Sequence, residues 1–223
     1  METSKEKAIL ILSGGMDSAT LLYKLLAEDF EVKALGFDYG QRHARELIHA
    51  SEIAAKEGVE FHEIDLTSIK PLLKGSSQTD PSVPVPHGHY AAENMKLTVV
   101  PNRNMIMLSI AAAFAMSEKA KWIAYAAHAG DHAIYPDCRP EFTDALVKAL
   151  GLADWHTVGL LRPFIELTKG QIVELGERLA VPYHLTYSCY EGGEVHCGLC
   201  GTCTERKEAF AHANAIDPTT YAS

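Results

Sequence analysis

The stretch AILILSGGMDSAT, which runs from Ala8 to Thr20, decides the fold of this chain. Its apolar run, Ile9 to Leu12, leads into a pair of glycines, and leucines with helical spacing follow the pair. A fully apolar run bounded by glycines is typical of a strand buried on both faces of a parallel sheet. Strand, glycine turn and helix together create an anion site. The glycines let the backbone approach a phosphate, and the first N–H groups of the helix are unpaired.

The residues that join this strand to its helix are candidates for nucleotide binding: Leu12, Ser13, Gly14, Gly15, Met16, Asp17, Ser18, Ala19 and Thr20. Several of them carry hydroxyl donors, and Asp17 is a candidate ligand for the Mg²⁺ that accompanies a triphosphate. The chain has no GxxxxGK[ST] motif, which excludes a kinase-type phosphate loop, and no GxGxxG after the strand, which disfavours a dinucleotide fold. A glycine turn without a ligand is the structural alternative. The form S-G-G-x-D-S resembles the pyrophosphate loop of the N-type ATP pyrophosphatases, which implies cleavage of ATP between its α and β phosphates.

Length and composition favour one sizeable core with an appendage. The chain has 223 residues, of which 47% are hydrophobic, and a net charge of −9 that disfavours a nucleic-acid partner. Residues Met1 to Lys7 are polar, so no signal peptide is expected, and the longest apolar stretch, Met105 to Met116, is too short to span a bilayer. We therefore expect a cytoplasmic protein with no membrane partner and with reduced thiols.

Strand-like and helix-like segments alternate along the chain, and this alternation predicts an α/β fold with a doubly wound, parallel, five-stranded sheet. In such sheets ligands bind beyond the C-terminal ends of the strands. The four further strands are expected at Val32–Asp38, Val59–Leu66, Trp122–Ala127 and Leu160–Ile165. The further helices are expected at Ala44–Glu57, Met105–Ser117, Glu141–Leu150, Thr168–Leu179 and Thr204–Ala213.

The segment Thr67–Pro101 interrupts this alternation with five prolines and a Gly-Ser-Ser run. Segments of this length and composition are usually functional lids or disordered inserts, and we interpret this one as a lid over the site. His87 and His89 lie within it, but two histidines in a proline-rich loop are more often solvated than bound to metal. We therefore predict no metal in the lid.

Arg103 lies in VPNRN, just before the apolar helix Met105–Ser117, for which Asn102 or Asn104 is the candidate N-cap. An arginine at a helix N-terminus is electrostatically disfavoured unless it meets an anion. Arg103 is therefore a candidate anion ligand. A solvent-exposed arginine without a ligand is the alternative, and the spacing alone supports it equally.

Four of the five cysteines are crowded into the tail, at Cys189, Cys197, Cys200 and Cys203, with glycines between them. Four thiolates on tight turns suit a tetrahedral, structural Zn²⁺ with no open position for water. A disulfide is disfavoured in a reducing compartment. An iron–sulfur cluster is the serious rival, but its fourth cysteine usually lies downstream and before a proline, whereas Cys203 precedes Thr204. We divide the chain into an α/β domain, residues 1–187, and a zinc-binding tail, residues 188–223.

Together these motifs resemble the 7-cyano-7-deazaguanine synthase family of queuosine biosynthesis. The matching stretches are distributed over nearly the whole chain in the order of the family. They are LSGGMDS at 12–18, FDYGQRH at 37–43, VPNRN at 100–104, YPDCRPEF at 135–142, ELTKGQI at 166–172 and the SCY…CGLCGTC tail at 188–203. YPDCRPEF and the four-cysteine tail make the match specific. The family commonly has glycine where Asn102 stands and often glutamine at Met16.

The resemblance implies an adenine-nucleotide alpha-hydrolase-like fold and an ATP-dependent carbon–nitrogen ligase with one zinc per chain. Its substrates would be 7-carboxy-7-deazaguanine and ammonia, and the product would be the nitrile 7-cyano-7-deazaguanine. ATP would activate first the carboxylate and then the amide intermediate, and the enzyme would be a homodimer. Lys169 and Arg103 are then expected to neutralise charge beside Asp17. Asp137 and Arg139 are expected to meet the base and its carboxylate.

The sequence is also compatible with two other functions. Another N-type ATP pyrophosphatase could amidate its substrate or thiolate tRNA, with Cys138 as a persulfide carrier, but the chain lacks a basic RNA-binding extension. A non-catalytic zinc-bearing interaction module would leave the phosphate loop without a use.

Overall fold

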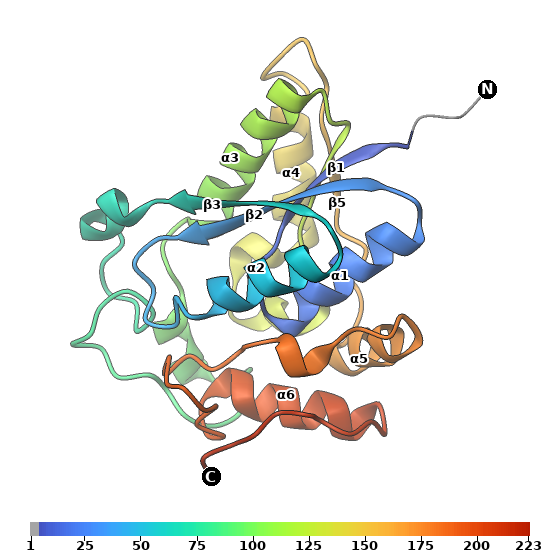
Figure 1. The fold of residues 1–223 in the computed structure, drawn as a ribbon. Coiled ribbons are helices and arrows are strands. Elements are labelled where there is room, and N and C mark those ends of the chain that lie inside the picture. The colour runs from blue at the N-terminus through green and yellow to red at the C-terminus, as the bar shows by residue number, and fades with distance from the viewer. Residues whose placement is uncertain (1–4) are drawn as a thin grey trace.

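A parallel sheet of five strands forms the centre of the molecule (Figure 1). The computed structural model describes residues 5–223. The strands lie in the order β3-β2-β1-β4-β5, and every neighbouring pair is parallel, as the alternation of segments predicts. Their bounds are Lys7–Ile11 for β1, Glu31–Asp38 for β2, Glu60–Asp65 for β3, Trp122–Ala124 for β4 and Gly159–Leu161 for β5.

Helices cover both faces of the sheet. The α-helices are α1 (Met16–Ala27), α2 (Glu46–Lys56), α3 (Arg103–Glu118), α4 (Pro140–Leu150), α5 (Lys169–Arg178) and α6 (Gly201–His212). Shorter 3₁₀ turns are η1 (Thr67–Leu72), η2 (Glu93–Thr98), η3 (Ala129–Ala133), η4 (Pro136–Cys138) and η5 (Tyr183–Leu185). Each predicted helix is present, with ends that differ from the prediction by at most three residues.

The alternation of side chains along the strands sorts the helices into two layers. Ile9 of β1 packs in one core cluster with Leu108 of α3 and Leu146 of α4. The next residue, Leu10, packs in the opposite cluster with residues of α1, α2 and α6, such as Leu22 and Phe210. In Figure 1, α3 and α4 accordingly lie above the sheet, and α1, α2, α5 and α6 lie below it. This three-layer arrangement is the doubly wound fold.

The strand order reverses beside β1. The chain first passes outward from β1 to β2 and β3, and α3 then carries it back to β4 on the other side of β1. The loops that follow β1 and β4 therefore leave the sheet in opposite directions. This divergence opens a crevice at the C-terminal ends of these two strands.

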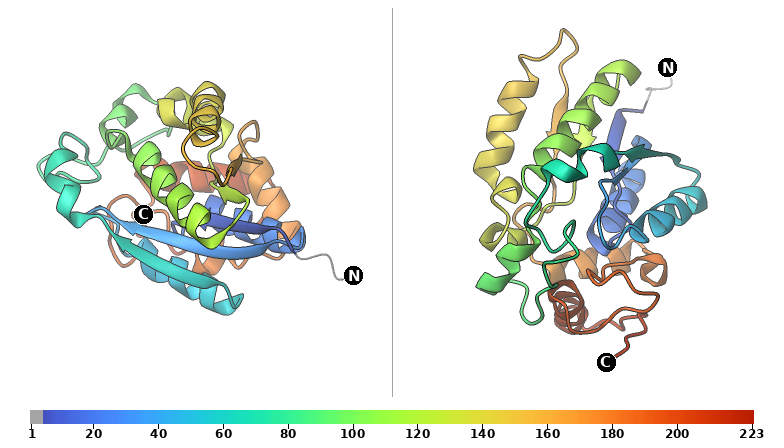
Figure 2. Two further views of the ribbon diagram at one scale, coloured as in Figure 1. Left: turned by 90° about the horizontal axis from the view of Figure 1, so that it is seen from above. Right: turned by 90° about the vertical axis from the view of Figure 1, so that its left-hand side faces the viewer.

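Residues 67–101 pack against the body of the protein and reach the cysteine tail (Figure 2). Ser76 to Thr79 are buried, although all four are polar. The Ser77 N–H donates to the Leu97 carbonyl (2.8 Å), and the Ser76 hydroxyl donates to the Thr98 carbonyl (3.1 Å). His87 and His89 are exposed and lie near carboxylates of Glu191 and Glu208, outside any metal-binding cluster found in residues 5–223.

Asn102 occupies the N-cap position of α3, as predicted, but its side chain makes no capping hydrogen bond. Its backbone is left-handed (φ 57°), a conformation that glycine and asparagine tolerate better than other residues.

The tail, residues 188–223, packs on the α/β body through α6, which lies against α5 (Figure 1). The division at residue 187 stays a prediction. In the described part of the chain, no helix combines the length and apolar character needed to cross a bilayer. The first four residues of the polar segment Met1–Lys7, on which the expectation of no signal peptide rests, lie outside the described residues.

Candidate active site and metal centre

A pocket opens at the C-terminal ends of β1, β2 and β4, at the point where the strand order reverses. Its walls come from the loop after β1, from the end of β2 and the turn that follows it, and from Tyr125 to Ala127 after β4. The N-termini of α3 and α5 and part of the cysteine tail complete it. Segments that are distant in sequence thus share one cavity, as the fold rule for open α/β sheets predicts.

The turn between β1 and α1 has the geometry of an anion-binding loop. Gly14 has a φ of +87°, and a Cβ there would lie 2.1 Å from the Glu46 carbonyl oxygen, so glycine is required. The hydroxyl of Ser18 donates to the Gly15 carbonyl (3.0 Å) and lies 3.1 Å from the hydroxyl of Ser13. These bonds shape the turn and aim the unpaired N–H groups of the first turn of α1 at the pocket.

The predicted nucleotide-binding residues divide into two groups. Those that line the pocket are Leu12, Ser13, Gly15, Met16, Asp17 and Ser18. Ala19 and Thr20 are fully buried and do not line it, and the Thr20 hydroxyl donates to the Met16 carbonyl (2.8 Å). Gly14 does not line the pocket, but its left-handed backbone conformation shapes the loop.

A network of ionised side chains surrounds Lys169, the first residue of α5. Its Nζ lies 3.0 Å from Asp17 Oδ2 and 2.7 Å from Glu205 Oε2. Burial alone would lower the pKa of Lys169, but the carboxylates of Asp17, Glu205 and Asp131 outweigh it and raise that pKa above its ordinary value. The ammonium is therefore charged at every physiological pH and faces the pyrophosphate loop.

The other oxygen of Asp17, Oδ1, is buried and has no hydrogen-bond partner within the described residues. An unpartnered carboxylate oxygen beside a phosphate loop is the donor that Mg²⁺ prefers. His128 stands close by, with Nε2 3.8 Å from Asp17 Oδ2 and 3.6 Å from Asp131 Oδ1. The residues present thus fit a magnesium nucleotide.

Tyrosines and a single arginine form the opposite side of the pocket. Arg103 Nη1 donates to the Tyr39 hydroxyl (3.3 Å), and its guanidinium lies 5.9 Å from the centre of that ring. Tyr135 and Tyr190 share a hydrogen bond between their hydroxyls (3.3 Å), and the Tyr90 ring lies 6.0 Å from that of Tyr135. We call Tyr39, Tyr90, Tyr135 and Tyr190 the tyrosine compartment. Flat apolar walls with one cation suit a planar, anionic ligand.

The structure does not bring Asp137 and Arg139 to the pocket lining. Asp137 Oδ2 accepts a hydrogen bond from the Asn104 N–H (3.2 Å), so this carboxylate satisfies a free donor at the start of α3. The exposed Arg139 side chain donates from Nε to the His132 carbonyl (2.8 Å). Of the predicted catalytic side chains, Asp17, Arg103 and Lys169 are the ones that share the cavity.

Cys138 does line the pocket, and its thiol accepts a hydrogen bond from Asn104 Nδ2 (3.2 Å). Burial raises the pKa of this thiol well above its ordinary value. Because the thiolate is the reactive form of cysteine, this environment does not suit a nucleophile or a sulfur carrier.

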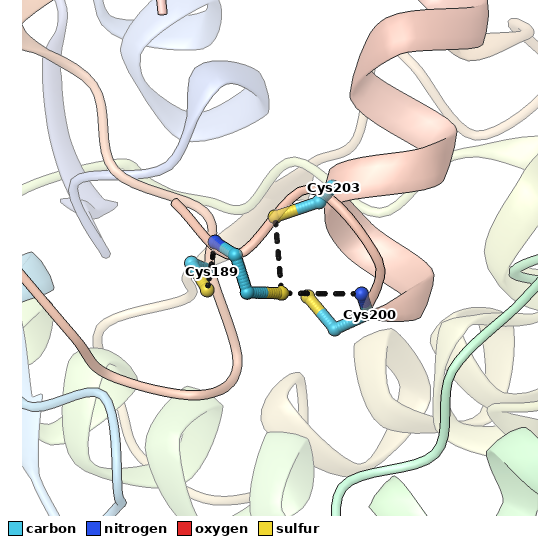
Figure 3. A group of neighbouring side chains, drawn as sticks. Cys189, Cys200 and Cys203 are labelled. Carbon is cyan, nitrogen blue, oxygen red and sulfur yellow. Dashed lines mark hydrogen bonds between the residues drawn. The ribbon is translucent and has the colours of Figure 1, made fainter. Parts of the chain in front are cut away.

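The four tail cysteines converge on one point. Their sulfur atoms all lie within 4.8 Å of one another, and Figure 3 shows Cys189, Cys200 and Cys203 directed toward a common centre. A tetrahedral ion with metal–sulfur bonds of about 2.3 Å would separate its sulfurs by about 3.8 Å. The Sγ atoms of Cys197 and Cys203 are 4.0 Å apart. The donor set therefore fits a single metal ion. Backbone N–H groups also donate to two of these sulfurs, from Cys197 to Cys189 Sγ and from Cys200 to Cys197 Sγ.

The metal centre adjoins the pocket. Cys203 lies in the first turn of α6, between Thr202, which lines the pocket, and Glu205, which pairs with Lys169. The Thr202 hydroxyl donates to the carbonyl of Ser188 (2.6 Å), another pocket residue. Sequence reasoning missed Glu205, His128 and Asp131, because Asp17 and Lys169, which they meet in the pocket, lie far from them in the chain and only the fold brings them together.

Comparison with known proteins gives consistent matches over nearly the full length. A family model described as "Queuosine biosynthesis protein QueC" matches residues 7–214. The curated 7-cyano-7-deazaguanine synthase of Methanoregula boonei is 52% identical over 96% of this chain and 99% of its own length. Proteins of the same name from Rhizobium etli and Hahella chejuensis are each 50% identical, over 96% and 97% of this chain and 92% and 94% of their own lengths.

Solved structures with the same fold are more distant. NMN synthetase from Francisella tularensis superposes with a TM-score of 0.54 at 17% identity, over 96% of this chain and 79% of its own. The U34-tRNA thiolase NcsA of Methanococcus maripaludis, solved with its [4Fe-4S] cluster, gives 0.52 at 17% identity, over 93% of this chain and 65% of its own. At these identities the similarity shows the fold alone. The fold, the family model and the curated relatives agree, and this chain belongs to the QueC family of queuosine biosynthesis proteins.

Proposed function

We propose that this protein is a 7-cyano-7-deazaguanine synthase, which converts 7-carboxy-7-deazaguanine and ammonia into the nitrile at the expense of ATP. The names of the relatives at about half identity support this assignment. One observation carries it in the structure. A phosphate loop with Asp17 and Lys169 shares a single pocket with the tyrosine compartment and Arg103.

The first step would activate the carboxylate. A carboxylate oxygen of the substrate attacks the α-phosphorus of ATP, the bond to the β-phosphate breaks, and pyrophosphate leaves. The N–H groups of the loop and the ammonium of Lys169 face the pyrophosphate as its charge develops, so they stabilise this step without reorganisation. Arg103 neutralises the incoming carboxylate and holds it in the pocket.

The following steps would build the nitrile. Ammonia attacks the adenylated carbon, loses a proton, and displaces AMP, which leaves the amide. The amide oxygen then attacks the α-phosphorus of a second ATP and again releases pyrophosphate. Loss of AMP together with the remaining N–H protons forms the carbon–nitrogen triple bond. Each original carboxylate oxygen leaves on one AMP, so the atoms balance with two ATP per nitrile.

Asp17 would hold the Mg²⁺ of the nucleotide through its unpartnered oxygen, and the ion would neutralise phosphate charge when bound. Cys189, Cys197, Cys200 and Cys203 would hold one Zn²⁺, whose role is structural because four thiolates leave no position for water. A four-iron cluster places several irons between its sulfurs and needs a wider cage than this one. Asp137 and Arg139 receive no contact role here, because neither lines the pocket.

The segment 67–101 would act as the lid that keeps water from the two adenylates. Tyr90, which lies in this segment, already lines the pocket. We expect hydrogen exchange in residues 67–101 to slow when ATP and substrate bind. Unchanged exchange would count against a lid.

A homodimer in the cytoplasm is the remaining part of the proposal. Light scattering of the eluting protein is expected to give twice the chain mass of 24.4 kDa, and a monomer mass would contradict the dimer. Recovery in the cytosolic fraction of cells is expected, and recovery with membranes would contradict the location.

The function is tested by the fate of ATP. The protein incubated with 7-carboxy-7-deazaguanine, ammonium, magnesium and ATP should yield AMP and pyrophosphate together with the nitrile, as separated by chromatography. ADP as the main nucleotide product would contradict the proposal. AMP without nitrile would point instead to another N-type ATP pyrophosphatase.

A further inference from the structure

Glu46 places a nearly buried carboxyl group in the wall of the pocket. It is the first residue of α2, at the point where this helix touches the pyrophosphate loop through Gly14. Its side chain is 13% exposed and lines the pocket beside Tyr39 and His43. Packing of the backbone against Gly14 thus fixes this carboxyl group close to the bound nucleotide.

No cation of residues 5–223 lies within 4.0 Å of this carboxyl group except the ring of His43, 3.4 Å away. Burial lowers the pKa of His43 to about 3, so this ring is neutral. The amide of Gln41 approaches to 3.5 Å, which is long for a hydrogen bond. A buried carboxyl group with such weak partners is costly to the fold, and residues of this kind concentrate at functional sites.

The charged side chains of the pocket fall into two groups. Asp17, Asp131 and Lys169 belong to the phosphate side, where their charges meet one another and Glu205. Arg103 and Glu46 remain at the tyrosine compartment, and no ion pair of 4.0 Å or less joins them in the described chain. One cation and one carboxyl group are therefore available there to a ligand.

We propose that Glu46 selects the base of the substrate by accepting hydrogen bonds from its N1–H and its 2-amino group. This inference rests on the proposed function, because it presumes a deazaguanine in the tyrosine compartment. Two adjacent donors on one edge of a planar base match the two oxygens of an ionised carboxyl group. Hydrogen bonds donated to the charged form favour it over the neutral acid, so binding of the base is coupled to ionisation of Glu46. Arg103 then contacts the carboxylate of the substrate. Arg103 and Glu46 would thus bind two different groups of the same ligand, its carboxylate and the donor edge of its base.

The same carboxyl group discriminates against the other purine in the reaction. The six-membered ring of adenine presents one amino donor beside an unprotonated ring nitrogen, which would face a carboxylate oxygen with a lone pair. A deazaguanine analogue without the 2-amino group would leave one oxygen of Glu46 unpaired. Sites built around such hydrogen bonds reject ligands that lack them much more strongly than apolar pockets do.

The test compares 7-carboxy-7-deazaguanine with its analogue that lacks the 2-amino group, at saturating ATP and ammonium. We expect the wild-type protein to favour the natural substrate in kcat/KM by about 100-fold or more. Glu46→Gln should reduce this preference by about tenfold or more, mainly through a raised KM for the natural substrate, with the KM for ATP unchanged. Glu52→Gln, which changes an exposed carboxylate on the same helix, should keep the wild-type preference.

Two results would overturn the inference. An equal preference in wild type and Glu46→Gln would mean that Glu46 does not contact the base. A raised KM for ATP with an unchanged preference would place the carboxyl group on the ribose hydroxyls of the nucleotide. If the wild-type protein converts neither base, the proposed function has failed, and that outcome is distinct from both of these.

Discussion

Asp17 connects the pyrophosphate loop to the ion network behind it. One of its oxygens pairs with Lys169 at 3.0 Å, and the other is buried and has no hydrogen-bond partner among residues 5–223. A carboxylate with one oxygen anchored and one free is positioned in advance to take a metal ion, because its orientation is already fixed by the lysine. We therefore expect Asp17 to contribute to catalysis more than to the stability of the fold.

Asp17→Asn is expected to reduce kcat by at least about 100-fold, because it removes the charge that would hold Mg²⁺ on the nucleotide. The midpoint of thermal unfolding should change little, since Lys169 keeps its contact with Glu205. Asp29→Asn, at an exposed carboxylate, is the control and should leave both quantities unchanged. Turnover near the wild-type rate in Asp17→Asn would exclude this role.

The free energy of unfolding of the ligand-free protein should depend on pH through the ionisation of Glu46. Burial raises the pKa of this carboxyl group to about 8 from an ordinary 4.5, against the opposing charge of Arg103 and the hydrogen bond from Gln41. His43, the nearest titratable ring, is neutral because burial lowers its pKa to about 3. A folded-state pKa above the unfolded one gives stability that is complete below about pH 4.5 and is lost as the pH rises through about 8.

Glu46→Gln removes this ionisation. The free energy of unfolding of the variant minus that of the wild type should therefore increase between about pH 5 and about pH 8. The increase is on the order of a few kcal/mol, at about 1.4 kcal/mol per pKa unit. Denaturant unfolding of the free protein at several pH values measures it, with Glu52→Gln as a control whose difference should stay flat. A flat difference in Glu46→Gln would show that the carboxyl group is already ionised in the folded protein.

Sequence reasoning indicates some of the site residues and misses others for a physical reason. Asp17, Arg103 and Lys169 each lie in the first turn of a helix that follows a strand in the order of elements, and helices of an α/β fold begin at the C-terminal edge of the sheet. Glu46 lies in the first turn of α2 and Glu205 in the second turn of α6, but an acidic residue near a helix start is usually solvated. Only the packing of α2 against Gly14 and of α6 against α5 buries them.

At the scale of elements, the sequence predicts the existence and order of the strands well and the C-terminal ends of β4 and β5 poorly. β4 ends at Ala124 rather than Ala127, and β5 ends at Leu161 rather than Ile165. The apolar run continues past Ala124, but these residues leave the sheet to line the pocket. Pro163 lacks the N–H that a further ladder bond requires, which accounts for the end of β5. β4 and β5 are therefore shorter than the apolar pattern alone predicts, because the residues after β4 line the pocket and a proline follows β5.

The N-terminal half of α6 joins the metal centre to the ion network. Cys200 is its N-cap residue and Cys203 lies in its first turn, and Glu205 in the next turn pairs with Lys169. Loss of the metal should therefore disturb both the tail and the phosphate side of the pocket.

Cys197→Ser should lower the thermal midpoint by several degrees and reduce the bound zinc below one ion per chain. Calorimetry and metal analysis of the purified protein measure the two effects. Cys138→Ser changes a buried thiol outside the cluster and should keep the full zinc content. A brown, anaerobic preparation of wild-type protein with visible absorption would contradict zinc and indicate an iron–sulfur cluster.

The chain holds one nucleotide motif, and the described residues form a pocket around it. The tail supplies one wall of that pocket, and Tyr90 brings the segment 67–101 to another. Acid and amide each present an oxygen to the same α-phosphate, so one geometry can serve both activations. The central claim is that both take place here in succession.

Mass spectrometry of a single reaction tests this claim most directly. Purified protein would be incubated with 7-carboxy-7-deazaguanine, ammonium, magnesium and ATP, and the bases and nucleotides would be followed over time. The account predicts an amide that rises and then falls before the nitrile accumulates, with two AMP formed per nitrile and with conversion of added amide only when ATP is present. A reaction that stops at the amide, or a nitrile formed from the amide without ATP, would contradict it.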